Sequence, residues 1–275
     1  MKRTHLWKFL GPLAVLGVLL TGCVNRPNPL TQPNSRSSSS LVSEQSNNSN
    51  SALNPQDSRK STNSSSAATS DYGGITQTQI DELATKKFQS GQSAIIQVNN
   101  GRSTLNPNSW HSNKVIYSDL DKLNRTSSPN TGFLEEHNRA NEELRVRQTV
   151  DPTAWHHNHG KVQIYNRGHM IAYSVSAGIA QDGSYDPNST SGDQNNPKNL
   201  FTQTAFSNQK LQTIYERKVR ESIESGHKVI YQVIPIFSGS ELMARGVNLQ
   251  AISTDRSLNF NVYIFNVQPG YSFDY

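Results

Sequence analysis

The chain has 275 residues, which is enough for one domain of ordinary size or two small ones. Apolar residues make up 33% and charged residues 17%, both low shares, so the excess is in uncharged polar residues, and this composition excludes a multi-span membrane protein. A single cysteine excludes a disulfide scaffold and a cysteine-based zinc finger. The net charge of +5 arises mainly in residues 1–71, because residues 72–275 carry nineteen basic against eighteen acidic residues. Overall charge therefore gives no support for nucleic-acid binding, and any such function must rest on a local site.

The first 22 residues have the pattern of a secretory signal. Three basic residues at positions 1–8 precede an almost wholly apolar run at 9–20, which is shorter than the roughly 20 residues that span a bilayer. The run ends in Leu-Thr-Gly-Cys at 20–23, which resembles the bacterial lipobox, in which the cysteine is lipidated and becomes the first residue of the mature protein. We therefore predict a signal peptide over 1–22 and a lipid anchor at Cys23. An ordinary cleaved signal with an incidental cysteine is the alternative.

Residues 23–71 are expected to form a disordered tether. Within 31–70 there are fifteen Ser and six Asn, more than half of the window, so few residues could form a core. A flexible chain of about 50 residues has an r.m.s. reach of ~40 Å. The tether would hold one folded domain, residues 72–275, clear of the envelope.

The remaining sequence predicts both helices and strands, without regular alternation. The expected helical segments are 78–88, capped by Thr78, and 119–125, 138–146 and 211–223. The expected strands are 93–98, closed by a hairpin turn at Asn100-Gly101, and 162–165, 229–237 and 258–264, the last of them half-buried. This order favours an α+β fold with a central antiparallel sheet in a single domain.

The segment Tyr165-Asn166-Arg167-Gly168-His169 is the first with chemical content. It places a histidine just after a predicted strand, with an arginine two residues earlier and a glycine that would permit a tight bend. A histidine can take up a proton near neutral pH, and an arginine can hold a phosphate through two hydrogen bonds. A surface turn is the alternative for this segment taken alone.

A polar stripe on the predicted helix is the second candidate. Its members are spaced by four: Asn208, Gln212, Glu216 and Arg220. Since each step of four drifts by ~40° around a helix, they form one slanting line. Magnesium prefers oxygen ligands and keeps most of its waters, so one amide and one carboxylate acting through water would suffice to hold it. The alternative is a solvated helix face, in which Glu216 and Arg220 form an ordinary surface pair.

Together the two segments resemble the DNA/RNA non-specific endonuclease family, the ββα-metal nucleases with an Asp-Arg-Gly-His signature, and in particular bacterial secreted nucleases. In that family an Asn follows the signature, and a metal-ligand Asn, a Glu and an Arg come nine, eight and four residues later in turn. The spacings here match: nine from Asn199 to Asn208, eight from there to Glu216 and four from there to Arg220. The resemblance covers about residues 93–275.

The resemblance implies these roles: His169 as general base, Asn208 as direct metal ligand, Glu216 as the group that orients metal-bound water, Arg167 and Arg220 as phosphate contacts, and Asn199 as a positioning residue. The implied ion is Mg²⁺, with Mn²⁺ as a substitute, and the implied fold contains the ββα-metal motif. The implied reaction is sequence-non-specific hydrolysis of DNA, with RNA as a further substrate class, to 5′-phosphate and 3′-hydroxyl ends. No protein partner is predicted. The enzyme is expected on the outer face of a bacterial cell membrane, held there only by its lipid anchor or released from it.

One residue departs from the family signature, since Asn166 stands where the family has Asp. An Asn keeps the hydrogen-bonding capacity of this side chain but loses its negative charge. If that charge raises the basicity of the histidine, His169 has a lower pKa here and the pH profile of activity is shifted to acid. The alternative function is a lipid-anchored nucleic-acid-binding protein that cuts weakly or not at all.

Zinc binding by His156, His157 and His159 together with His169 is a further alternative. No carboxylate or cysteine completes this set at a clear spacing. We therefore expect loop histidines at the rim of the site, where they would contact substrate.

Overall fold

The computed structural model describes residues 70–273. The predicted signal peptide, Cys23 and almost all of the predicted tether lie outside these residues. Within residues 70–273, no helix is both long enough and apolar enough to cross a membrane.

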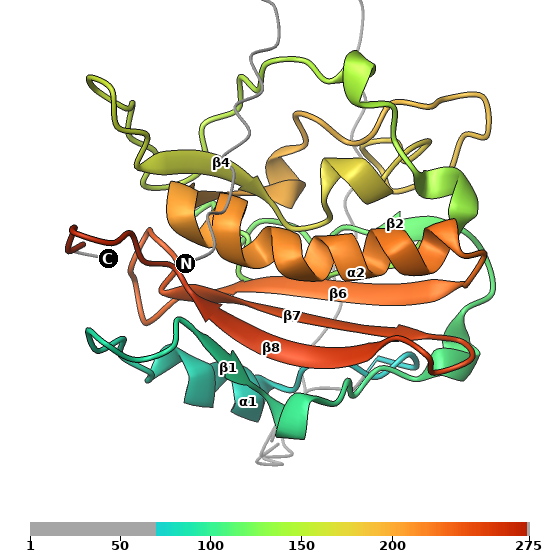
Figure 1. Cartoon of the computed structure of the whole chain (residues 1–275), viewed down its shortest axis with the longest axis horizontal. Helices are drawn as coiled ribbons and strands as arrows, with labels where there is room; N and C mark the ends of the chain where they lie inside the picture. Colours follow the sequence, from blue (N-terminus) through green and yellow to red (C-terminus); the bar gives the residue numbers. More distant parts are fainter. Residues whose placement is uncertain (1–69, 274–275) are drawn as a thin grey trace, which may run out of the picture. The chain divides into compact units, whose positions relative to one another are not determined.

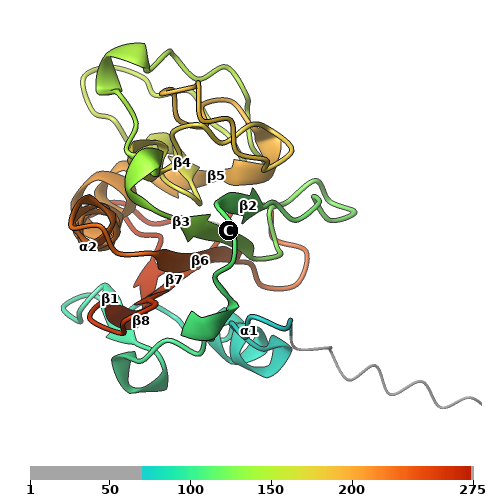
Figure 2. The same ribbon diagram turned by 90° about the vertical axis from the view of Figure 1, so that its right-hand side faces the viewer.

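The architecture is a six-stranded antiparallel sheet with a separate two-stranded ribbon over one face (Figure 1). In spatial order the sheet consists of β1 (Ile95–Gln97), β8 (Asn259–Phe265), β7 (Gly246–Ser253), β6 (Val229–Ile236), β3 (Asn130–Leu134) and β2 (Lys114–Ile116). The ribbon pairs β4 (Tyr165–His169) with β5 (Leu200–Thr204). α1 (Gln77–Ala84) lies on one face of the sheet, and α2 (Thr213–Glu224) lies with the ribbon on the other (Figure 2). These elements confirm the predicted α+β fold with a central antiparallel sheet.

The side chains of β8 show how both faces of the sheet are covered. Phe260, Val262 and Ile264 point into the core beneath α2, whereas Tyr263 and Phe265 point into a second core beneath α1. The alternation of apolar and polar residues in the sequence predicted a strand with one solvent-exposed face. That expectation is wrong, because α1 packs on the face that would otherwise meet water, and every residue of β8 after Asn259 is buried.

The first helix is confirmed, but its cap is Thr76 rather than Thr78. The hydroxyl of Thr76 accepts a hydrogen bond from the backbone N–H of Gln79 at 3.3 Å, and the side chain of Gln79 accepts one from the backbone N–H of Thr76 at 3.0 Å. The expected hairpin at Asn100-Gly101 does not form. Asn100 adopts its left-handed conformation (φ 55°) inside a 3-10 turn, and β1 pairs with β8 instead.

Short 3-10 helices fill several connections: Asn99–Gly101, Pro107–Ser109, Glu136–Asn138, Glu142–Leu144, Tyr173–Val175 and Pro197–Asn199. Two of them replace the helix predicted at 138–146. The helix predicted at 119–125 is a turn. The carboxylate of Asp121 accepts the backbone N–H groups of Leu123 at 2.8 Å and Arg125 at 2.9 Å, so these groups do not need helical partners.

Leu83 tests whether α1 is an integral part of the fold. Its side chain is 3% exposed and packs with β6 and β8. We expect Leu83→Ala to lower the free energy of unfolding by about 2–3 kcal/mol, since a large-to-small change in a core leaves a cavity. Urea denaturation measures this. Leu123→Ala is the matched control, because Leu123 is 41% exposed; equal effects for the two variants would show that α1 is only loosely docked.

Candidate active site

A strand–strand–helix unit brings the two predicted segments together. β4 and β5 are antiparallel, with His169 opposite Leu200 and Tyr165 opposite Thr204. β5 leads through the π-helical segment Ser207–Gln212 into α2. His169 is thus the last residue of a strand rather than the first after one. The strand predicted at 162–165 is wrong in its bounds, since residues 162–164 belong to the loop that precedes β4 and only Tyr165 is part of a strand.

Gly168 serves close packing rather than a bend. It lies inside β4, and a Cβ atom at this position would come within 2.2 Å of Oε1 of Gln203 on β5. The glycine therefore leaves room for the Gln203 side chain to lie flat against the ribbon.

Gln212 is fully buried and joins three elements. Its amide Nε2 donates to the backbone carbonyl of His169 and to Oε1 of Glu216, both at 2.8 Å. Its own Oε1 accepts from Nε2 of Gln203 at 3.0 Å. One side chain therefore fixes β4, β5 and α2 to one another at the point where the candidate residues meet.

The π-helical segment changes the direction in which Asn208 points. In a regular α-helix, the eight residues from Asn208 to Glu216 would leave their side chains ~80° apart. A π-helix closes its hydrogen bonds over five residues, so each of its residues turns by a smaller angle about the helix axis. This smaller turn reduces the angle between the side chains of Asn208 and Glu216. Asn208 and Glu216 accordingly line one cavity.

This cavity, the candidate catalytic cavity, has a volume of about 660 Å³. Its lining includes Arg145, Gln148, Arg167, His169, Asn208 and Glu216. The structure therefore unites four of the predicted residues, which come from β4, the π-helical segment and α2. Arg220 is not among the residues that line the cavity; its side chain is exposed on α2, and its contact with phosphate stays a prediction.

Asn199 is buried behind the cavity, next to the chain that follows His169. Its Oδ1 accepts the backbone N–H of Ile171 at 2.8 Å, while its Nδ2 donates to the carbonyl of Ile171 and to Asp193, both at 2.9 Å. Tyr117 donates to the same carboxylate oxygen of Asp193 at 2.5 Å. This network holds the end of β4 in place, in agreement with a positioning role for Asn199.

His169 is held neutral by its surroundings. Burial, with a smaller contribution from the positive charge of Arg145, lowers its pKa to about 4, and hydrogen bonding to the backbone of Gln194 and Asp193 only partly opposes this. Its Nδ1 lies 3.5 Å from Nε2 of Gln148. At neutral pH the imidazole is therefore uncharged, and its unprotonated ring nitrogen can accept a proton from water.

The pKa of Glu216 is shifted in the opposite direction, upward. Burial raises its pKa to about 7, while the hydrogen bond from Gln212 and the charge of Arg145 lower it. A cation beside this carboxylate would favour its ionised form, and the amide oxygen of Asn208 is a second hard donor. The donor set fits a divalent ion such as Mg²⁺ that keeps most of its waters.

The histidine cluster that could bind zinc does not form. Across the described part of the chain, no group of three or more His, Cys, Asp or Glu side chains is placed to hold a metal ion. His156, His157 and His159 are exposed on the loop before β4, as expected for rim residues.

Arg167 is held by the segment before that loop. Its Nη2 forms an ion pair with Asp151 at 2.5 Å, its Nε donates to the carbonyl of Val150 at 2.6 Å, and its guanidinium lies 4.1 Å from the ring centroid of Trp155. These contacts place a positive charge at the cavity wall in a fixed orientation.

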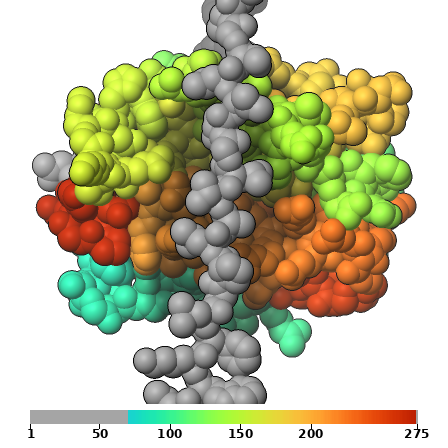
Figure 3. All heavy atoms as spheres, turned by 45° about the horizontal axis from the view of Figure 1, so that its top comes forward, coloured from blue at the N-terminus to red at the C-terminus, as the bar shows by residue number. Residues whose placement is uncertain are grey.

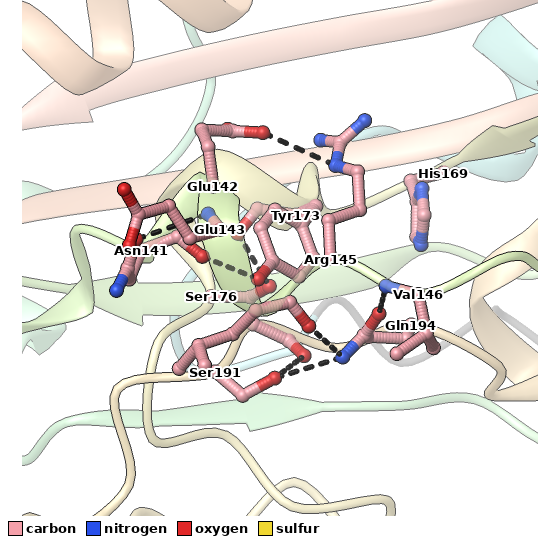
Figure 4. Close-up of polar contacts among 12 residues, drawn as sticks. Asn141, Glu142, Glu143, Arg145, Val146, His169, Tyr173, Ser176, Ser191 and Gln194 are labelled. Carbon is pink, nitrogen blue, oxygen red and sulfur yellow. Dashed lines mark hydrogen bonds and ion pairs between the residues drawn. The ribbon is translucent and has the colours of Figure 1, made fainter. Parts of the chain in front are cut away.

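Arg145 was not singled out from the sequence. It follows the 3-10 helix Glu142–Leu144, and its guanidinium lies 4.5 Å from the ring centroid of Tyr173, with Nε 3.2 Å from Glu142 (Figure 4). Gln194 anchors this segment, since its side chain accepts from the N–H of Val146 and donates to the carbonyl of Leu144. No spacing or composition signal marks this arginine, because its place depends on contacts with residues almost 50 positions away.

The central role of Gln212 can be measured. We expect Gln212→Leu to lower the free energy of unfolding by about 3 kcal/mol, because it leaves buried groups of β4, β5 and α2 without their hydrogen-bond partner. Urea denaturation is the measurement. Gln209→Leu is the matched control on the same segment, since Gln209 is exposed and its side chain donates only to Gln163. A loss no larger than that of the control would contradict the bridging role.

Comparisons with known proteins point to one family of nucleases. Residues 83–271 match the family described as DNA/RNA non-specific endonuclease. NucA from Streptococcus agalactiae with magnesium ion bound is similar in structure, with a TM-score of 0.58 and 26% sequence identity over 74% of this chain and 95% of that one. NucA from the same organism with no metal bound gives a TM-score of 0.54 and 29% identity over 66% and 83%.

Proposed function

The chain belongs to the DNA/RNA non-specific endonuclease family and is a nuclease, and on that premise we propose that it is a magnesium-dependent enzyme that cuts DNA outside the cell. The observation that carries the proposal is the meeting of His169, Asn208 and Glu216 around one cavity, which three arginines also line. These residues supply a base, oxygen donors for a metal, and positive charge for a phosphodiester.

The proposed reaction is the attack of water on phosphorus with departure of the 3′ oxygen, which leaves 5′-phosphate and 3′-hydroxyl ends. His169, neutral at physiological pH, would take the proton from the attacking water. Arg145 and Arg167 would hold the phosphate and compensate its growing negative charge. Asn208 and Glu216 would hold a divalent ion, which, when bound, stabilises charge on the phosphate and on the leaving oxygen.

The same arrangement supports cutting without regard to sequence. The arginines and oxygen donors of the cavity recognise a phosphate, which is common to every nucleotide and carries no sequence information. RNA contains the same group, so we propose RNA as a second substrate class.

The proposed location rests on the sequence of residues 1–71. A signal peptide over 1–22, a lipid anchor at Cys23 and a tether over 23–71 would place the nuclease domain, residues 72–275, on the outer face of a bacterial membrane. This location suits an enzyme whose substrate is extracellular nucleic acid.

Cleavage of plasmid DNA by the purified protein tests the proposal. We expect cutting with Mg²⁺ or Mn²⁺ and none with a chelator, and a loss of about 10²-fold or more in His169→Ala, because a general base contributes that much to the rate. Asn208→Ala and Glu216→Gln should raise the Mg²⁺ concentration needed. His111→Ala, an exposed histidine outside the cavity, is the control. Binding of DNA by a folded protein that never cuts would favour the alternative of a binding protein.

The pH dependence of the rate reports on His169. The rate is measured at saturating Mg²⁺, which keeps the carboxylate of Glu216 ionised although burial raises its pKa to about 7. The pKa of His169 is lowered to about 4, so its imidazole stays neutral as the pH falls below 6.5, and activity is lost only as the pH approaches this lower value. Arg145→Gln removes a repulsive charge and should move the acid limb to higher pH. Arg139→Gln is the control, because Arg139 pairs with Glu224 on the surface.

Asn166→Asp tests the departure from the family signature. The added negative charge should also raise the pKa of His169 and move the acid limb upward. NMR titration of the histidine C–H signals, beside the rate profile, separates an effect on His169 from a loss of folding. An unchanged profile would show that the residue at this position does not set the basicity of the histidine.

A further inference from the structure

A second cavity adjoins the catalytic one. It has a volume of about 490 Å³ and is lined entirely by residues of 155–165, the loop that precedes β4 and its first residue. Trp155, His157, Asn158 and Tyr165 line both cavities. None of the residues around the second cavity carries a carboxylate, so a polyanion that fills the catalytic cavity can continue into it without repulsion.

β4 leads directly from one cavity to the other. Tyr165, Arg167 and His169 are alternate residues of the strand, so their side chains share one face. With a rise of about 3.3 Å per residue, Tyr165 lies ~13 Å from His169. The imidazole of His169, the guanidinium of Arg167 and the ring of Tyr165 thus follow one another in a line. Tyr165 therefore lies beside a nucleotide next to the one that is cut.

Two aromatic rings of this segment form a tilted pair with one exposed member. The ring of His156 lies 5.3 Å from that of Tyr165 with an interplanar angle of 39°, and His156 is exposed. Tyr165 is supported on another side by Phe273, whose ring centroid lies 6.0 Å away. Trp155, in contrast, is already engaged by the guanidinium of Arg167.

Asn158 fixes the shape of this loop. Its Oδ1 accepts the backbone N–H groups of Ile164 at 2.7 Å and Tyr165 at 2.8 Å, and its Nδ2 donates to the carbonyl of Tyr165 at 2.8 Å. These hydrogen bonds join the two ends of the segment 158–165, so its backbone holds the aromatic rings in fixed positions. In Figure 3 the yellow-green part of the chain, which contains the loop, forms a lobe at the molecular surface.

We propose that the second cavity is a stacking subsite for one unpaired nucleobase, adjacent to the phosphate being cut. A nucleobase can stack on one of the two rings of the His156–Tyr165 pair only if the face of the nucleobase is free, and in a duplex the neighbouring base pairs cover that face. The enzyme therefore binds single-stranded nucleic acid more tightly than a duplex. The inference rests on the proposed function, because it places the phosphate of the same strand in the catalytic cavity.

Binding without cutting tests this inference. The full-length protein with His169→Ala is titrated with a fluorescein-labelled single-stranded DNA oligonucleotide and with a blunt duplex of the same length. We expect His156→Ala and Tyr165→Leu each to weaken binding of the single strand about tenfold, the effect of losing one stacked base, and binding of the duplex less than twofold. Tyr165→Phe keeps the ring and should bind the single strand as the parent does. His111→Ala and Tyr271→Leu are the matched controls, since both residues lie outside the two cavities.

A 2-aminopurine base in the oligonucleotide provides a second readout. Its fluorescence should be quenched by stacking in the parent protein and recover in His156→Ala, even at saturating protein. Equal losses on single strand and duplex, or quenching that is unchanged in both loop variants, would overturn the inference. Plasmid cutting by protein with His169 intact is measured in parallel, so that a failure of the proposed function is seen separately from a failure of the subsite.

Discussion

The side chain of Gln212 is the constraint on which the site depends. Its amide nitrogen holds the end of β4 and the carboxylate of Glu216, and its oxygen holds Gln203 on β5. Because all of these groups are buried or half-buried, none has water as a ready replacement partner. A short polar bridge thus helps to set the distance between the proposed base and the proposed metal ligand, in addition to the packing of Ile171, Phe201 and Val219 in the hydrophobic core.

Charge in the cavity is organised around Arg145. Its positive charge lowers the pKa of His169 and also that of Glu216, so one cation favours both the neutral imidazole and the ionised carboxylate. Burial acts on the two groups with opposite consequences: it assists the neutral base but disfavours the anion. A divalent cation next to Glu216 would resolve this conflict, which is a physical reason to expect a metal at the proposed site.

Parts of the site could be predicted from the sequence because they are local. The spacing of Asn199, Asn208 and Glu216 along the sequence does not depend on where the helix is predicted to begin. The strand predicted at 229–237 is marked by a mainly apolar run of residues. β7 was missed because its second face carries amides; Asn248 and Gln250 are buried through hydrogen bonds to neighbouring strands that no local pattern reveals. The places of Arg145 and of Gly168 likewise depend on partners far away in the chain.

The arrangement of α1 has a consequence for access. α1 packs on the face of the main sheet opposite to α2 and the β4–β5 ribbon, and it is the first helix after residue 70 (Figure 2). No described residue before Glu142 lines the cavity. A nucleic acid could therefore occupy the cavity without contact with the segment that leads into α1, whatever orientation the domain takes.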